Sequence, residues 1–219
     1  MVQISELLLQ LSKAIDSKKD QEIEKISRLI QELPFETKEQ IGAKYRLALH
    51  LYLVENRLVE GMELFRNIAK AQIPCEETRL SQINVALALF LTDHKSLAIF
   101  ELRKVISEEK EASATKAMAQ SFLPILLSQL EGREREMELV QNENIDTLSV
   151  LARSRLNIAD AAHIKLLWAS ALESRGKPED LSRALAITKE IVNASVSLPK
   201  PTASLARQAL KRLSPPHRK

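Results

Sequence analysis

The sequence predicts an all-α fold of stacked antiparallel helix hairpins, with about 10–12 helices. The composition favours helix, because the 219 residues include only 4 glycines and are rich in Leu, Ala, Glu, Lys and Arg. Apolar residues recur at intervals of three and four along nearly the whole chain, as expected for amphipathic helices. Pro34, Pro74 and Pro199 fall between successive pairs of such segments, where they can end helices.

The first two helices show the pattern from which the others are predicted. One face carries Ile4, Leu7, Leu8, Leu11 and Ile15; residues 17–20 then interrupt the pattern, and Ile23, Ile26, Ile30 and Leu33 continue it. Two helices with a short polar link make a hairpin. Further helices are predicted over 38–55, 58–72, 76–92, 95–109, 113–131, 133–143, 146–157, 160–175, 179–194 and 201–213. Pro124 lies inside an apolar helical run, which predicts a kink there or a later helix start.

These helices predict a single helical-repeat domain over residues 1–213, long enough to bury a sizeable core. Residues 214–219 contain two prolines and cannot continue the last helix, so we expect a disordered tail. Cys75 is the only cysteine, so no internal disulfide can form. The first residues lack the pattern of a signal peptide. No apolar stretch reaches the ~18 residues of a membrane helix. Together these features indicate a cytoplasmic protein.

Residues 42–74 resemble the tetratricopeptide repeat (TPR), a helix pair of about 34 residues. With Gly42 as the first position, the matching residues are Tyr45, Ala48, Leu49, Tyr52, Asn56, Gly61, Phe65, Ile68 and Pro74. Weaker matches cover residues 79–110 and 162–195. The resemblance implies a TPR-like α-solenoid, and a divergent or mixed helical-repeat protein is the alternative.

The residues of this repeat have packing roles. Small residues at Ala48 and Gly61 let the two helices of the pair approach closely, and Asn56 takes a turn position at which Asn can adopt the left-handed conformation. A single hairpin cannot bury its own apolar face, so its neighbours must stack on it. Three aromatic side chains are therefore expected to be buried between neighbouring hairpins: Tyr45, Tyr52 and Phe65.

In TPR proteins the first helix of each pair lines a concave groove. The resemblance selects, by position, Arg46, His50 and Leu53 from the best unit and Leu80, Ile83, Leu87 and Phe90 from the next. Because most of these side chains are apolar, the groove is expected to bind an apolar helix or an extended segment of another protein. The alternative is that Leu87 and Phe90 are ordinary core residues between hairpins.

One known subset of TPR proteins clamps a peptide carboxylate with Lys and Asn side chains. Arg46 and His50 stand where that clamp has Lys and Asn, and Asn84 matches its third residue. The remaining positions fall on Ala119 and Leu123, which cannot bind a carboxylate. We therefore expect no carboxylate clamp.

No catalytic residue, metal site or cofactor is predicted. The sequence has no glycine-rich phosphate loop, no Gly-x-Ser-x-Gly motif and no His-Glu-x-x-His motif. None of the four histidines is spaced as a metal ligand, and no His stands beside Cys75 in the sequence. The predicted function is a non-enzymatic interaction module, acting as an adaptor, a scaffold or a chaperone-like protein, whose partner is another protein or peptide.

The C-terminal end suggests the alternatives. Residues 181–219 carry a formal charge of +7 and the preceding 180 residues −4, which raises nucleic-acid binding as a second function class. Against it, aromatic residues are few and are not interleaved with basic ones, so base stacking has little support. A structural subunit of a larger assembly is the other alternative. The last helix is expected to pack with Leu205, Ala209, Leu210 and Leu213 inward and to expose Arg207, Lys211 and Arg212.

Overall fold

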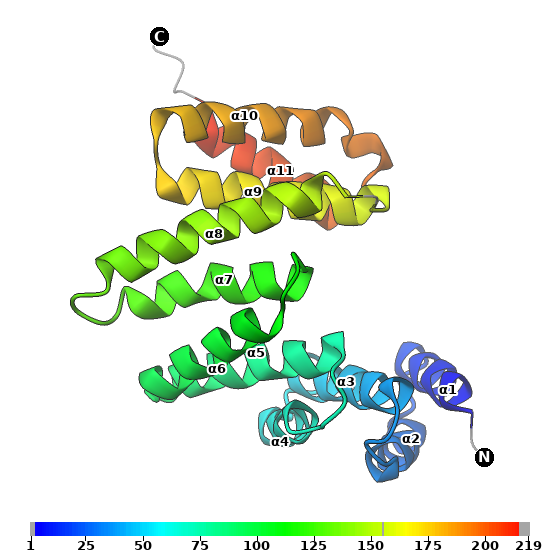
Figure 1. Ribbon diagram of the computed structural model, residues 1–219. Coiled ribbons are helices and arrows are strands. Elements are labelled where there is room, and N and C mark those ends of the chain that lie inside the picture. The colour runs from blue at the N-terminus through cyan, green and yellow to red at the C-terminus, as the bar shows by residue number, and fades with distance from the viewer. Residues whose placement is uncertain (1–2, 155, 215–219) are drawn as a thin grey trace. The chain divides into compact units, whose positions relative to one another are not determined.

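The computed structural model describes residues 3–154 and 156–214. These residues form eleven α-helices, one short 3-10 helix and no strand (Figure 1). The elements are α1 (Ile4–Asp16), α2 (Asp20–Glu32), α3 (Lys38–Leu53), α4 (Leu58–Ala69), α5 (Glu76–Leu91), α6 (Lys95–Glu108), α7 (Ala114–Leu127), α8 (Glu134–Ala152), α9 (Ile158–Arg175), α10 (Pro178–Asn193), η1 (Ser195–Ser197) and α11 (Lys200–Leu213). The all-α prediction is confirmed. Among the described helices none has the length and apolar character needed to cross a membrane.

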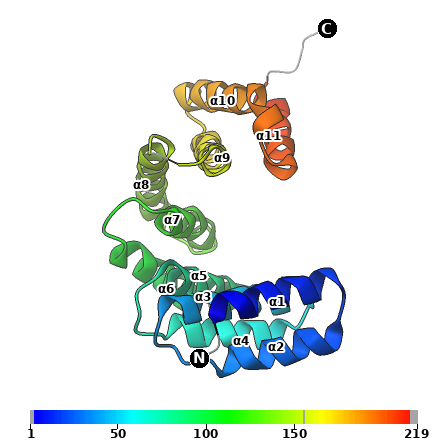
Figure 2. The ribbon, with the colours of Figure 1, turned by 90° about the vertical axis from the view of Figure 1, so that its right-hand side faces the viewer.

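The chain divides into two compact units, residues 1–102 and 103–219. In the first unit α1 packs on α2 and α3 packs on α4, while α3 also contacts α1 and α5. In the second unit α7 packs on α8 and α9 on α10, and α11 lies against both α9 and α10 (Figures 1 and 2). Contacts between helices two apart in the chain stack one hairpin on the next, which is the TPR-like arrangement. Of the predicted tail, residues 215–219 lie outside the described part.

The α3–α4 hairpin has the close packing that its sequence predicts. Gly61 of α4 faces α3 so closely that an added Cβ would lie 2.9 Å from the Tyr52 Cβ and 3.0 Å from the Ala48 carbonyl oxygen. The Phe65 ring is 1% exposed and lies 5.6 Å from Tyr45 and 6.2 Å from Tyr52, between ring centroids. The burial of Phe65 is confirmed. The two tyrosines are only half-buried, less than predicted.

Each hairpin turn carries one residue in the left-handed region. These residues are Lys18, Asn56, Asp93, Gly132 and Gly176, with φ between 52° and 74°. The left-handed conformation predicted for Asn56 is confirmed. At Lys18 and Asp93 the next backbone N–H donates to a carbonyl five residues back (Lys19 to Ala14, His94 to Leu89), which closes the helix end as a Schellman motif. A left-handed residue thus recurs in all five turns, and the ends of α1 and α5 share the Schellman hydrogen bond.

One predicted boundary is wrong. The helices expected over 133–143 and 146–157 are one continuous helix, α8, because Asn144 is buried within it and its amide donates to the Ser121 hydroxyl of α7 at 3.1 Å. This contact gives the buried Asn144 amide N–H a partner on α7. Of the two alternatives predicted for Pro124, a kink or a later helix start, the later start is not observed. Helix α7 begins at Ala114, capped by the Ser113 hydroxyl, and runs through Pro124 to Leu127.

Helix α11 differs from its prediction at one position. Its buried side is made of Ala203, Ala206 and Ala209, with Leu213 half-buried beside them. Leu205 is 53% exposed, so the expectation that it points inward is wrong. The reason is geometric: the buried residues recur every third position, and Leu205 falls between them on the outer side. Small alanines let α11 approach α9 and α10 closely.

Candidate functional site

The structure separates the predicted groove residues into exposed and buried ones. Arg46 is exposed, Leu53 is 69% exposed, and Leu80, Leu87 and Phe90 are half-buried. These five residues come from the neighbouring helices α3 and α5, on which they recur at intervals of three or seven residues along one side. We name these five residues, four apolar side chains and one cation, the α3/α5 surface.

Two predicted groove residues do not belong to this surface. Ile83 is 1% exposed, because α5 has buried residues on more than one side and Ile83 lies among them. His50 is also buried, and its Nε2 lies 2.9 Å from the Glu55 carboxylate, so the ring is turned into the hairpin turn. Neither side chain is available for direct contact with a partner. The docking prediction therefore rests on the other five residues.

Two exposed residues at the same end of these helices were missed. Val54 follows α3 directly, and Leu91 is the last residue of α5 and is 76% exposed. They occupy equivalent positions, two residues before the left-handed Asn56 and Asp93. A helix end next to a turn usually favours polar residues, so a repeated apolar residue at this position was the available signal.

Charged side chains hold the turn between α3 and α4 in place. Arg57 donates to Glu60 at 2.8 Å and to Glu55 and Glu24 at 3.2 Å each, and these bonds, with Glu60 first, raise the pKa of its guanidinium. Glu55 also receives the His50 contact, so a single network joins the turn to α3 and to α2. Such charge-assisted bonds fix the backbone that carries Val54 and Leu53. The exposed apolar residues therefore sit on a firmly held turn.

Polar contacts also tie α3 to α5 beneath the surface. The Tyr45 hydroxyl is hydrogen-bonded to the Asn84 side chain, and burial raises the pKa of this phenol. Near the other end of α3, a Cβ added to Gly42 would lie 3.4 Å from a Glu77 carboxylate oxygen. Helices α3 and α5 are thus in contact at more than one point along their length. These buried contacts set the spacing between the exposed side chains of the two helices.

Lys44 is a buried cation that the sequence analysis missed. Its side chain is 1% exposed, its ammonium donates to the Gln31 carbonyl, and it lies 4.4 Å from the centroid of the Phe35 ring. Burial lowers the pKa of the amine. Gln31 is in the last turn of α2, where carbonyls lack helical partners, so Lys44 closes that helix end. A signal was present, because Lys44 lies three residues after Ile41 on the buried face of α3.

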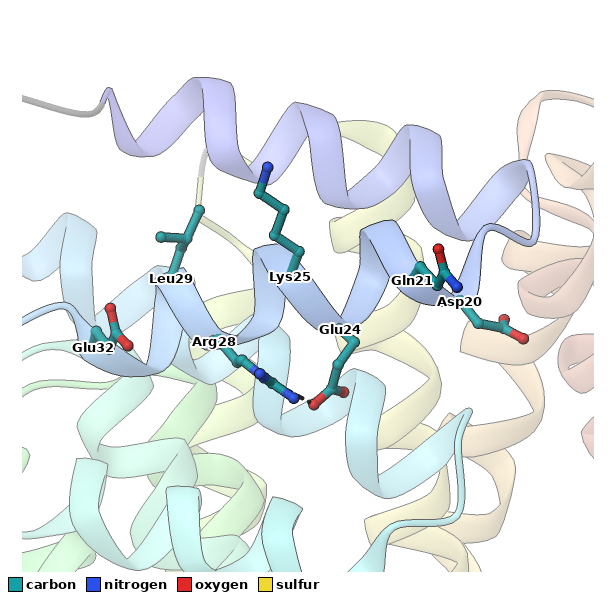
Figure 3. A pocket seen from close by; sticks show the side chains of 7 residues that line it. All are labelled: Asp20, Gln21, Glu24, Lys25, Arg28, Leu29 and Glu32. Atoms are coloured by element: carbon teal, nitrogen blue, oxygen red, sulfur yellow. Dashed lines mark hydrogen bonds and ion pairs between the residues drawn. The ribbon is translucent and has the colours of Figure 1, made fainter.

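The hollow along α2 does not resemble an active site. A hollow of about 610 Å³ runs along α2, and Figure 3 shows the side chains that line it: Asp20, Gln21, Glu24, Lys25, Arg28, Leu29 and Glu32. Glu24 and Arg28 pair across it at 3.3 Å, and the pKa of Glu24 is lowered by Arg57 and then by Arg28. All seven residues belong to a single helix. Opposite charges that neutralise each other along one helix are typical of a solvated face.

The second unit uses much of its charge in internal pairs. Arg175 donates to both carboxylate oxygens of the buried Asp180 at 2.7 Å and to Asn142 at 2.8 Å, and the first of these contacts lowers the pKa of the Asp180 carboxyl. Lys165 pairs with Glu190 at 2.6 Å.

The two clamp positions, Ala119 and Leu123, are both buried, so no carboxylate could reach them. Within the described residues no group of three His, Cys, Asp or Glu converges as metal ligands would.

The sequence matches no family model. A search of curated proteins also finds no match. Among solved structures, the chain is similar to a Podosopora anserina protein described as a kinesin light chain with nearly identical TPR-like repeats. The two are 15% identical over 89% of this chain and 99% of that chain, with a TM-score of 0.47. Identity this low bears on the fold at most, and says nothing of partners.

Proposed function

We propose that this chain is a protein-interaction module that binds an apolar helix or extended segment of another protein on the α3/α5 surface. The observation that supports the proposal is the exposure of Leu53, 69%, together with the half-exposed Leu87 and Phe90 on the neighbouring helix. Burying a Leu or Phe side chain stabilises a complex by about 1.5–3 kcal/mol. Three such side chains on a firmly held surface are sufficient anchors for a short segment.

The shape of the partner follows from the arrangement of the surface. Leu80 and Leu87 are seven residues apart on α5, and Arg46 and Leu53 have the same spacing on α3. Two parallel rows of side chains about 10 Å long fit one face of an amphipathic helix, whose apolar residues recur at three, four and seven residues. In a cell such a module acts as an adaptor, a scaffold or a chaperone-like protein, and we place it in the cytoplasm.

A peptide selection tests this proposal directly. Displayed 20-residue peptides would be selected on the full chain, and the best peptide measured by isothermal titration calorimetry. Leu53→Glu and Phe90→Glu should each weaken binding at least tenfold, which corresponds to about 1.4 kcal/mol. Leu139→Glu is the matched control, because Leu139 is a similarly exposed leucine on α8, and it should change affinity less than twofold.

The circular dichroism spectrum of all three variants should stay helical, because Leu53 and Leu139 are exposed and Phe90 is only partly buried. The proposal is wrong if selection enriches no peptide, or if the selected peptide binds the Leu53 and Phe90 variants as tightly as the wild type. Equal weakening by the Leu139 control would also overturn it, since the effect would then follow added charge and not position.

A further inference from the structure

The outer side of α11 carries a stripe of positive charge. Lys200, Arg207 and Lys211 are exposed and lie seven and four residues apart, so they share one side of the helix. The helix contains no Asp or Glu. Its buried side is the row of alanines, Ala203, Ala206 and Ala209, so the cations project away from α9 and α10. We name Lys200, Arg207 and Lys211 the α11 stripe.

Two neighbouring cations of this region, Arg212 and Arg183, have partners within the second unit, unlike the stripe. Arg212 donates to Glu173 of α9 at 3.0 and 3.2 Å, and Arg183 of α10 lies 4.4 Å from the centroid of the Trp168 ring. Over residues 3–154 and 156–214, no carboxylate pairs with Lys200, Arg207 or Lys211. Like charges four residues apart destabilise a helix, so the unneutralised Arg207 and Lys211 have an energetic cost that an acidic partner would remove.

We propose that the α11 stripe docks an acidic amphipathic helix of a partner protein. Charge complementarity defines the chemistry of that helix, which carries carboxylates along one side at the same spacing. The three cations cover about 16 Å of helix axis, with intervals of about 10 and 6 Å. Carboxylates at positions i, i+7 and i+11 of a facing helix meet all three, and an Asp or Glu at i+4 would face Ser204 in the gap. The stripe shares no residue with the α3/α5 surface, so neither proposal depends on the other.

The same observations favour a protein over a nucleic acid. Proteins that bind duplex DNA commonly contact about 6–10 phosphates, and the stripe offers three cations on one straight helix. Single-strand binders add aromatic side chains for base stacking, and α11 contains none. Arg183 of α10, the nearest of these cations with an aromatic contact, lies over the Trp168 ring and offers no free aromatic face for a base. Nucleic acid is therefore retained as an outcome of the test.

The probe is a synthetic 18-residue helix with Glu at i, i+4, i+7 and i+11, compared with a scrambled peptide of equal composition and helicity and with a 20-base-pair DNA duplex. Fluorescence anisotropy would measure each against the full chain at several salt concentrations. The stripe variant is Lys200→Glu, Arg207→Glu and Lys211→Glu combined, and a milder variant replaces all three by Gln. The matched control reverses three exposed cations of the first unit, Lys38, Arg66 and Lys70, with the same change in net charge.

We expect the matched peptide to bind at least fivefold tighter than the scrambled one. The stripe variant should lose at least tenfold in affinity, the Gln variant at least threefold, and the control less than twofold. Equal binding of the matched and scrambled peptides overturns the proposal, as does an unchanged affinity in the Gln variant with an intact helical spectrum. Tighter binding of the DNA duplex at physiological salt, lost in the stripe variant, would assign the stripe to nucleic acid and overturn the protein partner.

Discussion

Gly61→Ala tests the helix crossing on which the TPR-like hairpin depends. The added methyl carbon would lie 2.9 Å from the Tyr52 Cβ and 3.0 Å from both the Ala48 carbonyl oxygen and the Tyr52 backbone nitrogen. Ordinary contacts of a Cβ are 3.4–4 Å. Two of the three contacted atoms belong to the backbone of α3, so no side-chain rotation relieves the clash. Helices α3 and α4 would have to separate by about 0.5–1 Å, loosening the packing around Phe65.

The expected magnitude combines two opposing effects. Overpacking a well-packed core costs about 1–3 kcal/mol, and the backbone contacts place this site at the upper end. Alanine in place of glycine inside a helix recovers about 1 kcal/mol. The net loss in the free energy of unfolding is therefore about 2 kcal/mol, which lowers the melting temperature of a chain of this length by about 4–8 °C.

Gly42→Ala is the matched control, because Gly42 is also inside a helix, α3. Its added Cβ meets only the end of the flexible Glu77 side chain, at 3.4 Å, so the helix propensity dominates and stability should rise by about 1 kcal/mol. Urea unfolding followed by circular dichroism should separate the two variants by about 3 kcal/mol. If Gly61→Ala stabilises the protein as much as Gly42→Ala does, the close crossing of α3 and α4 is refuted.

Three further predictions test other parts of the fold. Phe65→Ala should cost about 3–5 kcal/mol because the ring is buried, and a near-neutral result in urea unfolding would contradict the repeat register. Lys18→Gly should raise stability by about 0.5–1 kcal/mol because φ is 52°, whereas the adjacent Lys19→Gly, at φ −97°, should not. Asp180→Ala should cost about 3 kcal/mol in the same assay by leaving Arg175 without its carboxylate. That pairing lowers the pKa of Asp180 in the folded protein. Its contribution to the free energy of unfolding is therefore present above about pH 4 and is lost as the pH falls further. If wild type and Asp180→Ala differ in stability by the same amount at pH 2 and at pH 7, this prediction is wrong.

The helices and their pairing were predictable because their signals are local. Apolar spacing, turn residues and interrupting prolines lie within a few residues of the elements they define, so most predicted boundaries agree with the structure within a few residues. Gly61 and Asn56 were predictable for the same reason, since each serves its own hairpin. The continuity of helix α8 was not, because the Asn144–Ser121 hydrogen bond that holds its middle against α7 joins residues 23 positions apart in the sequence.

The surface was less predictable, because exposure depends on neighbours that are distant in the sequence. The repeat register placed Leu53 and Ile83 in equivalent roles, yet one is exposed and the other is buried. Arg46 and Arg212 both looked like free surface cations, and only packing brought Glu173 to Arg212. Each residue turns a helix by about 100°, so a small rotation of one helix against its neighbours exchanges buried and exposed positions. The sequence by itself determined the helices, the hairpins and their close crossing at Gly61, whereas the tertiary structure decided which side chains are left for a partner.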